Sequence, residues 1–166
     1  FCQNSLIAPL EERHYNLYPF GMIKANDEFA FVATQNPVET SGTYRVSRVL
    51  VDRIGCWIRL GYPTRETEIE ILKVNAPAYD LPEGALHKIY EILNATRANP
   101  DLEIPASPRA GIYLTRLVDR YRGRFDDLDQ TIRFFAPSVL TKEMKVRNPQ
   151  KTVEGIIKEI LEDWLG

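Results

Sequence analysis

The sequence predicts an α/β protein in which a few buried parallel strands, up to about residue 63, precede an all-α bundle over residues 64–166. Two short apolar runs, at residues 29–34 (FAFVAT) and 56–60 (CWIRL), are rich in aromatic and branched side chains and favour strands buried on both faces. Beyond residue 63, apolar residues recur with a helical period between proline-containing turns. We therefore expect one domain part over 1–63 and a second over 64–166.

Four amphipathic helices are expected in the second part, because its apolar residues follow the spacing i, i+3, i+4, i+7 and its extensions. Together these helices predict a small bundle. The apolar positions are Leu86, Ile89, Tyr90 and Leu93; Ala110, Leu114, Leu117, Val118 and Tyr121; Leu128, Ile132, Phe135, Ala136 and Val139; and Val153, Ile157, Ile160, Leu161 and Trp164.

The composition excludes several classes of protein. The 166 residues include 44% apolar and 27% charged side chains, which suffices for a buried core and excludes intrinsic disorder. The net charge of −2 gives no signal for binding a polyanion, and arginines 116–124 alternate with aspartates, so we expect no nucleic-acid partner. No apolar run approaches the roughly 18 residues that span a bilayer. The first residue is Phe1 rather than Met, and we expect a fragment of a longer protein.

We expect structural roles for the cysteine and histidine side chains and for two glutamates. Two cysteines and two histidines lack the spacing of a zinc site, so no metal site and a reducing, cytoplasmic location are expected. Cys56 is expected to be buried and inert, and His87 lies beside the apolar stripe of its helix. Glu11 and Glu12 could act in acid–base chemistry, although a solvated helix end is the favoured interpretation.

Asn36 is a candidate site residue because it follows the first predicted strand. In open α/β sheets, ligands bind beyond the carboxyl ends of the strands, and Pro37 holds Asn36 in extended geometry. The alternative is that Asn-Pro simply ends the strand in a turn.

Two arginines are candidates for binding a phosphate. Arg53 precedes the second predicted strand and could offer its charged fork to a neighbouring phosphate, or form a surface ion pair with Asp52. Ser107 and Pro108 are a helix-start signal that places Arg109 in the first turn. A cation there opposes the helix dipole, so it favours a nearby anion or a solvated side chain.

These pieces together resemble the MoxR-type AAA+ ATPases over about residues 3–146. The stretch AFVATQNPVETSGTYRVSRVLVDRI, followed by GYPTRETEIEIL, is similar to the family's segment from sensor 1 through the arginine finger to the lid. ASPRAGIYL resembles the sensor 2 helix, RGRFDDLDQTIRFFAPSVL the last lid helices, and QNSLIAPLEER the helix after the Walker B strand. The resemblance implies the C-terminal part of a P-loop AAA+ core over 1–63 and a helical lid over 64–166.

The resemblance also implies roles for residues and partners. Asn36 would be sensor 1 beside the attacking water, Arg53 the arginine finger acting on ATP of the adjacent subunit, and Arg109 sensor 2. The complete protein would bind ATP and Mg²⁺, hydrolyse ATP and self-associate into a ring, expected as a hexamer. It would act like a chaperone in remodelling or activating protein complexes, with a von Willebrand factor A-domain protein as a candidate partner and the client unknown.

The sequence also departs from the family pattern. It contains no G-x-x-x-x-G-K-[ST] loop, so we expect the chain alone to be inactive. Val46-Ser47-Arg48-Val49 replaces Leu-Pro-Glu-Ala before the finger, and Lys142-Glu143 replaces a common His-Arg. The alternatives are a non-catalytic interaction module and a related AAA+ ring, such as a chelatase subunit or a helicase-like motor.

Overall fold

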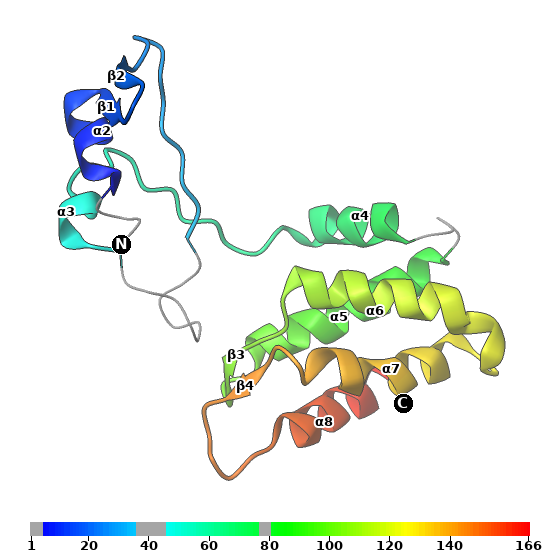
Figure 1. The fold of residues 1–166 in the computed structure, drawn as a ribbon. Coiled ribbons are helices and arrows are strands. Elements are labelled where there is room, and N and C mark those ends of the chain that lie inside the picture. Colours follow the sequence, from blue (N-terminus) through cyan, green and yellow to red (C-terminus); the bar gives the residue numbers. More distant parts are fainter. Residues whose placement is uncertain (1–4, 36–45, 77–80) are drawn as a thin grey trace. The chain divides into compact units, whose positions relative to one another are not determined.

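The computed structural model describes residues 5–35, 46–76 and 81–166, which belong to two compact units, Phe1–Leu60 and Gly61–Gly166 (Figure 1). The second unit is a helical bundle. Its elements are α4 (Arg65–Asn75), α5 (Glu83–Ala98), β3 (Leu102–Ile104), α6 (Pro108–Tyr121), the 3₁₀ turn η1 (Arg122–Arg124), α7 (Leu128–Leu140), β4 (Lys145–Val146) and α8 (Val153–Leu165).

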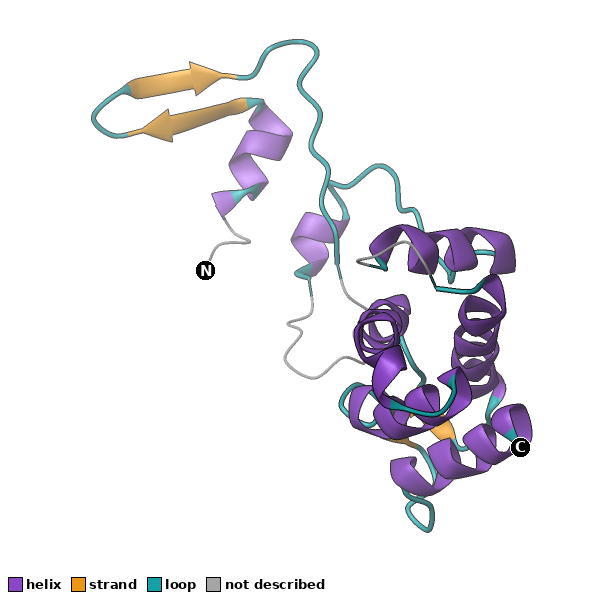
Figure 2. Ribbon diagram, turned by 90° about the vertical axis from the view of Figure 1, so that its right-hand side faces the viewer, coloured by secondary structure: helices purple, strands orange, loops and turns teal. Residues whose placement is uncertain are grey.

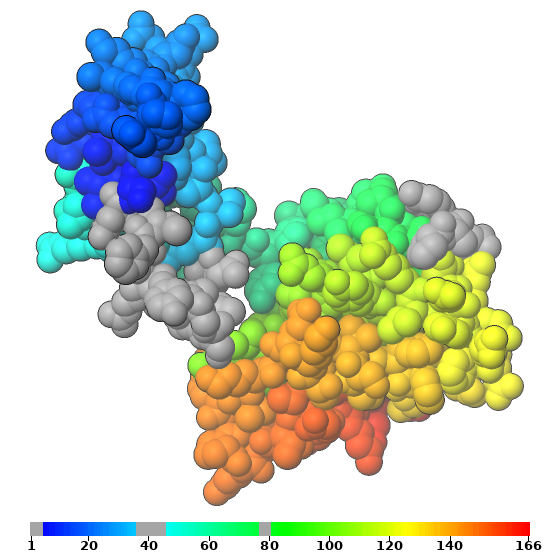
Figure 3. All heavy atoms as spheres, in the orientation of Figure 1, coloured from blue at the N-terminus to red at the C-terminus, as the bar shows by residue number. Residues whose placement is uncertain are grey.

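The four helices predicted from the apolar period are confirmed as α5, α6, α7 and α8. Helix α6 packs against α4, α5 and α7, while α8 packs against α5 and α7. Figure 3 shows the side chains of α6 and α7, in yellow and orange, packed along one another. The short strands β3 and β4 pair antiparallel, with Leu102 opposite Val146, and appear as small orange segments among the helices in Figure 2. The core that these elements enclose includes the fully buried Leu72, Ile89, Leu93, Leu114, Ile132 and Ile157.

Side-chain caps fix where four of these helices begin. Thr64, Ser107, Asp127 and Thr152 each accept a hydrogen bond from the backbone N–H three residues later, at 3.3, 3.2, 2.7 and 3.1 Å. Such caps satisfy one of the N–H groups that a helix start leaves without an intrahelical partner. The predicted start of α6 at Ser107 and Pro108 is confirmed.

Gly111 lets α6 approach α4 and α5 closely. A Cβ atom at this position would lie 2.5 Å from Leu93 Cδ1 and 3.0 Å from Leu72 Cδ2. Both leucines are fully buried, so neither side chain has solvent to move into. The close approach fixes the path of α6, whose first turn carries Arg109.

A buried ion pair joins α4 to α5. Glu68 has no exposed surface, and its carboxylate accepts hydrogen bonds from Arg97 Nη1 at 2.6 Å and from Arg97 Nη2 at 2.7 Å. The Arg97 guanidinium also lies 4.0 Å from the centroid of the Tyr62 ring. Its Nε donates to the carbonyl of Ala106 at 3.4 Å, so the same side chain reaches the segment before α6.

The first unit has a helix, a hairpin and a short helical turn among its described residues. These are α2 (Ile7–Glu12), β1 (His14–Leu17), β2 (Gly21–Lys24) and α3 (Arg48–Val51). Strands β1 and β2 pair antiparallel, with His14 opposite Lys24 and Leu17 opposite Gly21. In the ranges that the structure describes, every helix is too short or too polar to cross a bilayer.

The prediction of buried strands in the first unit is wrong for the described residues. Residues 29–34 and 56–60 form neither a strand nor a helix, and the side chains of Val32, Ile58 and Leu60 are 87%, 80% and 88% exposed. Cys56, predicted to be buried, is exposed. The physical reason is that a strand is stabilised by pairing, and the described part of the unit offers these two segments no partner strand.

Replacing Arg97 by Ala is expected to lower the free energy of unfolding of the helical unit by about 3–5 kcal/mol, because Glu68 would remain as a buried charge without its counter-ion. Urea unfolding followed by circular dichroism at 222 nm measures the change. The matched control is Lys158→Ala, which removes an exposed pair with Glu162 and should cost under about 1 kcal/mol. Equal effects of the two substitutions would contradict the assignment of Glu68–Arg97 as a structural pair.

Candidate functional site

The structure describes two of the three residues that the sequence predicts to contact phosphate or water. Asn36 lies outside the described residues. Arg53 belongs to the first unit and Arg109 to the second, so each is described within its own unit.

Arg53 lies two residues beyond the end of the short helix α3. Ser47 caps α3 by accepting a hydrogen bond from Leu50 N at 3.2 Å, and Arg53 N donates to the Leu50 carbonyl at 3.1 Å. The cap and this turn fix the backbone from which the Arg53 side chain extends. That side chain is 24% exposed.

The guanidinium of Arg53 is held by two acceptors. Its Nε donates to Glu11 Oε2 at 3.0 Å, and Nη2 donates to the same oxygen. Nη1 donates to the carbonyl of Val49 at 2.8 Å. The ion pair foreseen with Asp52 is instead formed with Glu11, 42 positions away in the sequence.

Arg53 also lines an open hollow of about 260 Å³ in the first unit. Arg13 is the other cation at this hollow, and its Nη2 donates to the carbonyls of Asn26 and Asp27 at 2.7 and 3.2 Å. These hydrogen bonds hold the segment after β2 in place, so Arg13 stabilises the fold of the first unit. The remaining lining residues are Pro9, Leu10, Phe29, Phe31, Ile54, Gly55 and Cys56.

Arg109 occupies the first turn of α6 and is exposed. Among the described residues, none accepts a hydrogen bond from its guanidinium or forms an ion pair with it. The positive end of the helix dipole lies at the same turn, where it disfavours a cation by about 0.3–1 kcal/mol, and a nearby anion reduces this penalty. This arrangement suits an oxygen-rich anion such as a phosphate.

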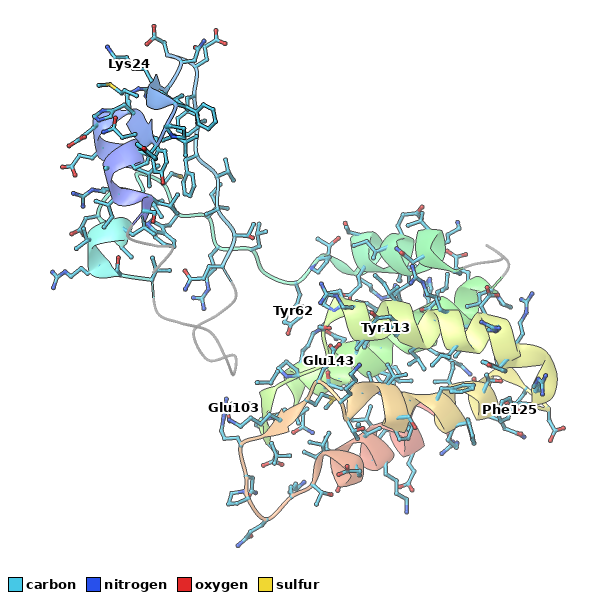
Figure 4. All side chains as sticks on the ribbon, viewed as in Figure 1. Lys24, Tyr62, Glu103, Tyr113, Phe125 and Glu143 are labelled. Atoms are coloured by element: carbon cyan, nitrogen blue, oxygen red, sulfur yellow. The ribbon has the colours of Figure 1, made fainter. Side chains whose placement is uncertain are left out.

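A carboxylate lies at the cap of this helix. The hydroxyl of Ser107 donates to Glu143 Oε2, and Glu143 follows the end of α7. Figure 4 labels Glu143 together with Tyr62 and Tyr113 of the same unit. Ser107 thus accepts from Ala110 N and donates to Glu143, which holds the start of α6 against the end of α7.

The weaker candidates have structural contacts. His87 Nδ1 lies 3.2 Å from Arg65 Nη2, and Arg65 Nε donates to Glu91 at 3.1 Å, so these side chains form a surface network between α4 and α5. Glu12 pairs with His14 at 3.2 Å beside the end of α2. Within the described ranges, no group of three or more His, Cys, Asp or Glu residues is arranged to hold a metal ion.

Two contacts, one structural and one at the candidate site, are not predicted from the sequence. Glu68 precedes the buried Leu72 by one helical turn, and a carboxylate on an apolar helix face is a signal that a buried cation partner is required. The Glu11–Arg53 pair gave no comparable signal, because both residues are charged side chains at partly exposed positions far apart in the sequence.

Comparison with known proteins gives weak and partial matches. No family model matches the chain. The uncharacterized protein YeaC of Bacillus subtilis is 27% identical over 186 aligned residues, which cover 96% of this chain and 58% of that protein. The gas vesicle ATPase GvpN of Ancylobacter aquaticus is 27% identical over 95 residues, covering 57% of this chain and 26% of GvpN.

A third relative carries the family name suggested by the sequence motifs. The chaperone MoxR1 of Mycobacterium tuberculosis is 34% identical over 74 residues, which cover 42% of this chain and 18% of MoxR1. A solved protein from Cytophaga hutchinsonii covers 96% of this chain at 22% identity, but its TM-score of 0.39 is too low to add weight. The chain thus spans at most about three fifths of these proteins. The matches to GvpN and MoxR1 support a relationship to MoxR-like AAA+ ATPases at low identity.

Proposed function

We propose that this chain is the C-terminal part of a MoxR-like AAA+ ATPase, with residues 1–63 belonging to the α/β core and residues 64–166 forming the helical lid. The observation that carries the proposal is the pair of partial matches to GvpN and MoxR1. Arg109, an exposed cation in the first turn of a capped helix with no described acceptor, is compatible with the same assignment. The bundle of α4 to α8 is compatible with a lid.

In the proposed reaction, three residues act on the terminal phosphate of ATP. Asn36 orients the attacking water, and Arg53 stabilises the charge that develops on the transferred phosphoryl group held by the adjacent subunit. Arg109 reaches from the lid to the phosphate of its own subunit, so that occupancy of the nucleotide site changes the angle of the lid. The guanidinium groups fit phosphate oxygens because each donates N–H bonds in a planar fork.

Binding of ATP and Mg²⁺ requires residues beyond those assigned in this chain. The sequence contains no G-x-x-x-x-G-K-[ST] motif, so the loop that cradles the phosphates would be supplied by another part of the complete protein or by a partner polypeptide. Mg²⁺, when bound, neutralises charge on the phosphates. The residues of this chain would then contribute orientation and positive charge only.

The exposed apolar segments of the first unit are consistent with an incomplete core. Residues 29–34 and 56–60 carry Val32, Ile58 and Leu60 in solvent, where burial of such side chains would be favourable by about 1.5–3 kcal/mol each. In this proposal, strands and helices of the remaining core cover them. The complete protein would self-associate into a ring and remodel or activate a client protein, with a von Willebrand factor A-domain protein as candidate partner.

The same exposed side chains favour one second candidate, a non-catalytic module that binds a partner through them. A stoichiometric complex with a separate polypeptide that carries the P-loop would favour a split ATPase. Stable binding only to proteins without a nucleotide site would favour the module.

Replacing Arg53 by Ala in the complete ATPase is expected to lower kcat for ATP hydrolysis by about 10³–10⁵-fold, because the developing charge loses its counter-cation. Replacing Arg109 by Ala should weaken ATP binding and hydrolysis together. Steady-state phosphate release measures both. The matched control is Arg147→Ala, an exposed arginine outside the proposed site. Unchanged turnover in Arg53→Ala would refute the proposed finger.

Mg-ATP titrated into the 166-residue chain alone is expected to give no binding heat, because the sequence holds no phosphate-cradling loop. Isothermal calorimetry makes the measurement, with the complete ATPase as the positive control. Micromolar binding to the chain alone would show that its arginines hold a nucleotide without that loop.

A further inference from the structure

We propose that Glu11 is a positioning residue for Arg53, which holds the guanidinium so that one edge of it faces a phosphate. This inference rests on the proposed function, because it assigns an orienting partner to the proposed arginine finger. It starts from the contact of Glu11 in α2 with Arg53, which lies just beyond α3 and 42 positions further along the sequence.

The donor count of the guanidinium carries the inference. An arginine side chain has five N–H groups, and the Nε and Nη2 bonds to Glu11 occupy the side edge of the plane. The bond from Nη1 to the Val49 carbonyl uses a third N–H group. One N–H on Nη1 and one on Nη2 remain, and no described residue accepts from them. These two N–H groups lie away from the Nε bond to Glu11, and they can donate to the oxygens of a phosphate.

The bonds from Glu11 and Val49 fix both the direction and the rotation of the fork. A free arginine must lose its rotamer freedom on contacting an anion, whereas Arg53 is already restrained by its two partners. The restraint is compatible with binding, because the side chain keeps 24% of its surface exposed. Immobilising a side chain of this type in advance corresponds to roughly a three- to tenfold gain in rate or affinity.

The Glu11 carboxylate also lowers the net positive charge beside the phosphate, and this weakens the attraction of Arg53 for the phosphate only slightly. Glu11 is 59% exposed, so water and salt screen its charge at the far edge of the guanidinium. The orienting effect requires only the oxygen that accepts from Nε and Nη2. An amide oxygen at the same place would orient Arg53 without the negative charge.

Glu12 provides a matched control for Glu11. It is the next residue on α2, but its carboxylate pairs with His14 Nε2 at 3.2 Å and not with Arg53. A substitution at Glu12 therefore changes the charge of the same helix end and leaves the orienting bonds intact.

In the complete ATPase, Glu11→Ala is expected to lower kcat three- to tenfold with little change in KM for ATP, since the finger acts on the transition state. Glu11→Gln is expected to restore kcat to within twofold of the unsubstituted protein, and Glu12→Gln to leave it unchanged. A rise of kcat in both Glu11 variants would overturn the proposal, because it would show that Glu11 masks the finger. A loss as large in Glu11→Gln as in Glu11→Ala would also overturn it.

A second readout separates this inference from the proposed function. In the ¹⁵N-labelled 166-residue chain, the Nε–H signal of Arg53 is expected to be resolved and protected from exchange with water, lost in Glu11→Ala and retained in Glu11→Gln and Glu12→Gln. An Arg53 signal that is unprotected, or that Glu11→Ala leaves unchanged, would overturn the positioning role. If this signal behaves as expected but Arg53→Ala leaves ATP hydrolysis intact, the proposed function fails and the positioning contact stands.

Discussion

The buried ion pair between Glu68 and Arg97 is the constraint on which the helical unit depends. A carboxylate without any exposed surface is stable only beside a cation that satisfies both of its oxygens, so α4 and α5 are held in one register. The same arginine contacts Tyr62 and the Ala106 carbonyl, while Thr96 Oγ1 accepts from Ala106 N at 3.1 Å. The segment entering α6 therefore has a fixed path, and the direction of Arg109 follows from it.

The helices of the second unit could be predicted because each carries its own signal. A stripe such as Leu86, Ile89 and Leu93 needs only a helical period to face the core, and Ser107 with Pro108 marks a helix start locally. Helix α4 was not singled out, because its buried face includes the charged Glu68. The charge breaks the apolar pattern, and its partner Arg97 lies on another helix.

The first unit could not be predicted in the same way, because its stability depends on partners that no local pattern specifies. A strand requires a neighbouring strand, so the apolar content of residues 29–34 and 56–60 does not determine whether they pair. The orientation of Arg53 was equally inaccessible, because it depends on the distant Glu11. The type of side chain at the candidate site could be predicted from the sequence, whereas its contacts required the tertiary structure.

The two candidate arginines differ in a way that matches two different tasks. Arg53 is restrained by three hydrogen bonds, so it offers its positive charge in a fixed direction. Arg109 has no described counter-ion and lies at the positive end of α6, so it keeps its full charge and its freedom to move. A fixed fork suits stabilisation of a transition state whose geometry is defined, because misdirected charge gives no rate gain. An unrestrained cation suits the detection of a phosphate, because it can turn toward an anion while Glu68 and Arg97 hold the helices beneath it in place.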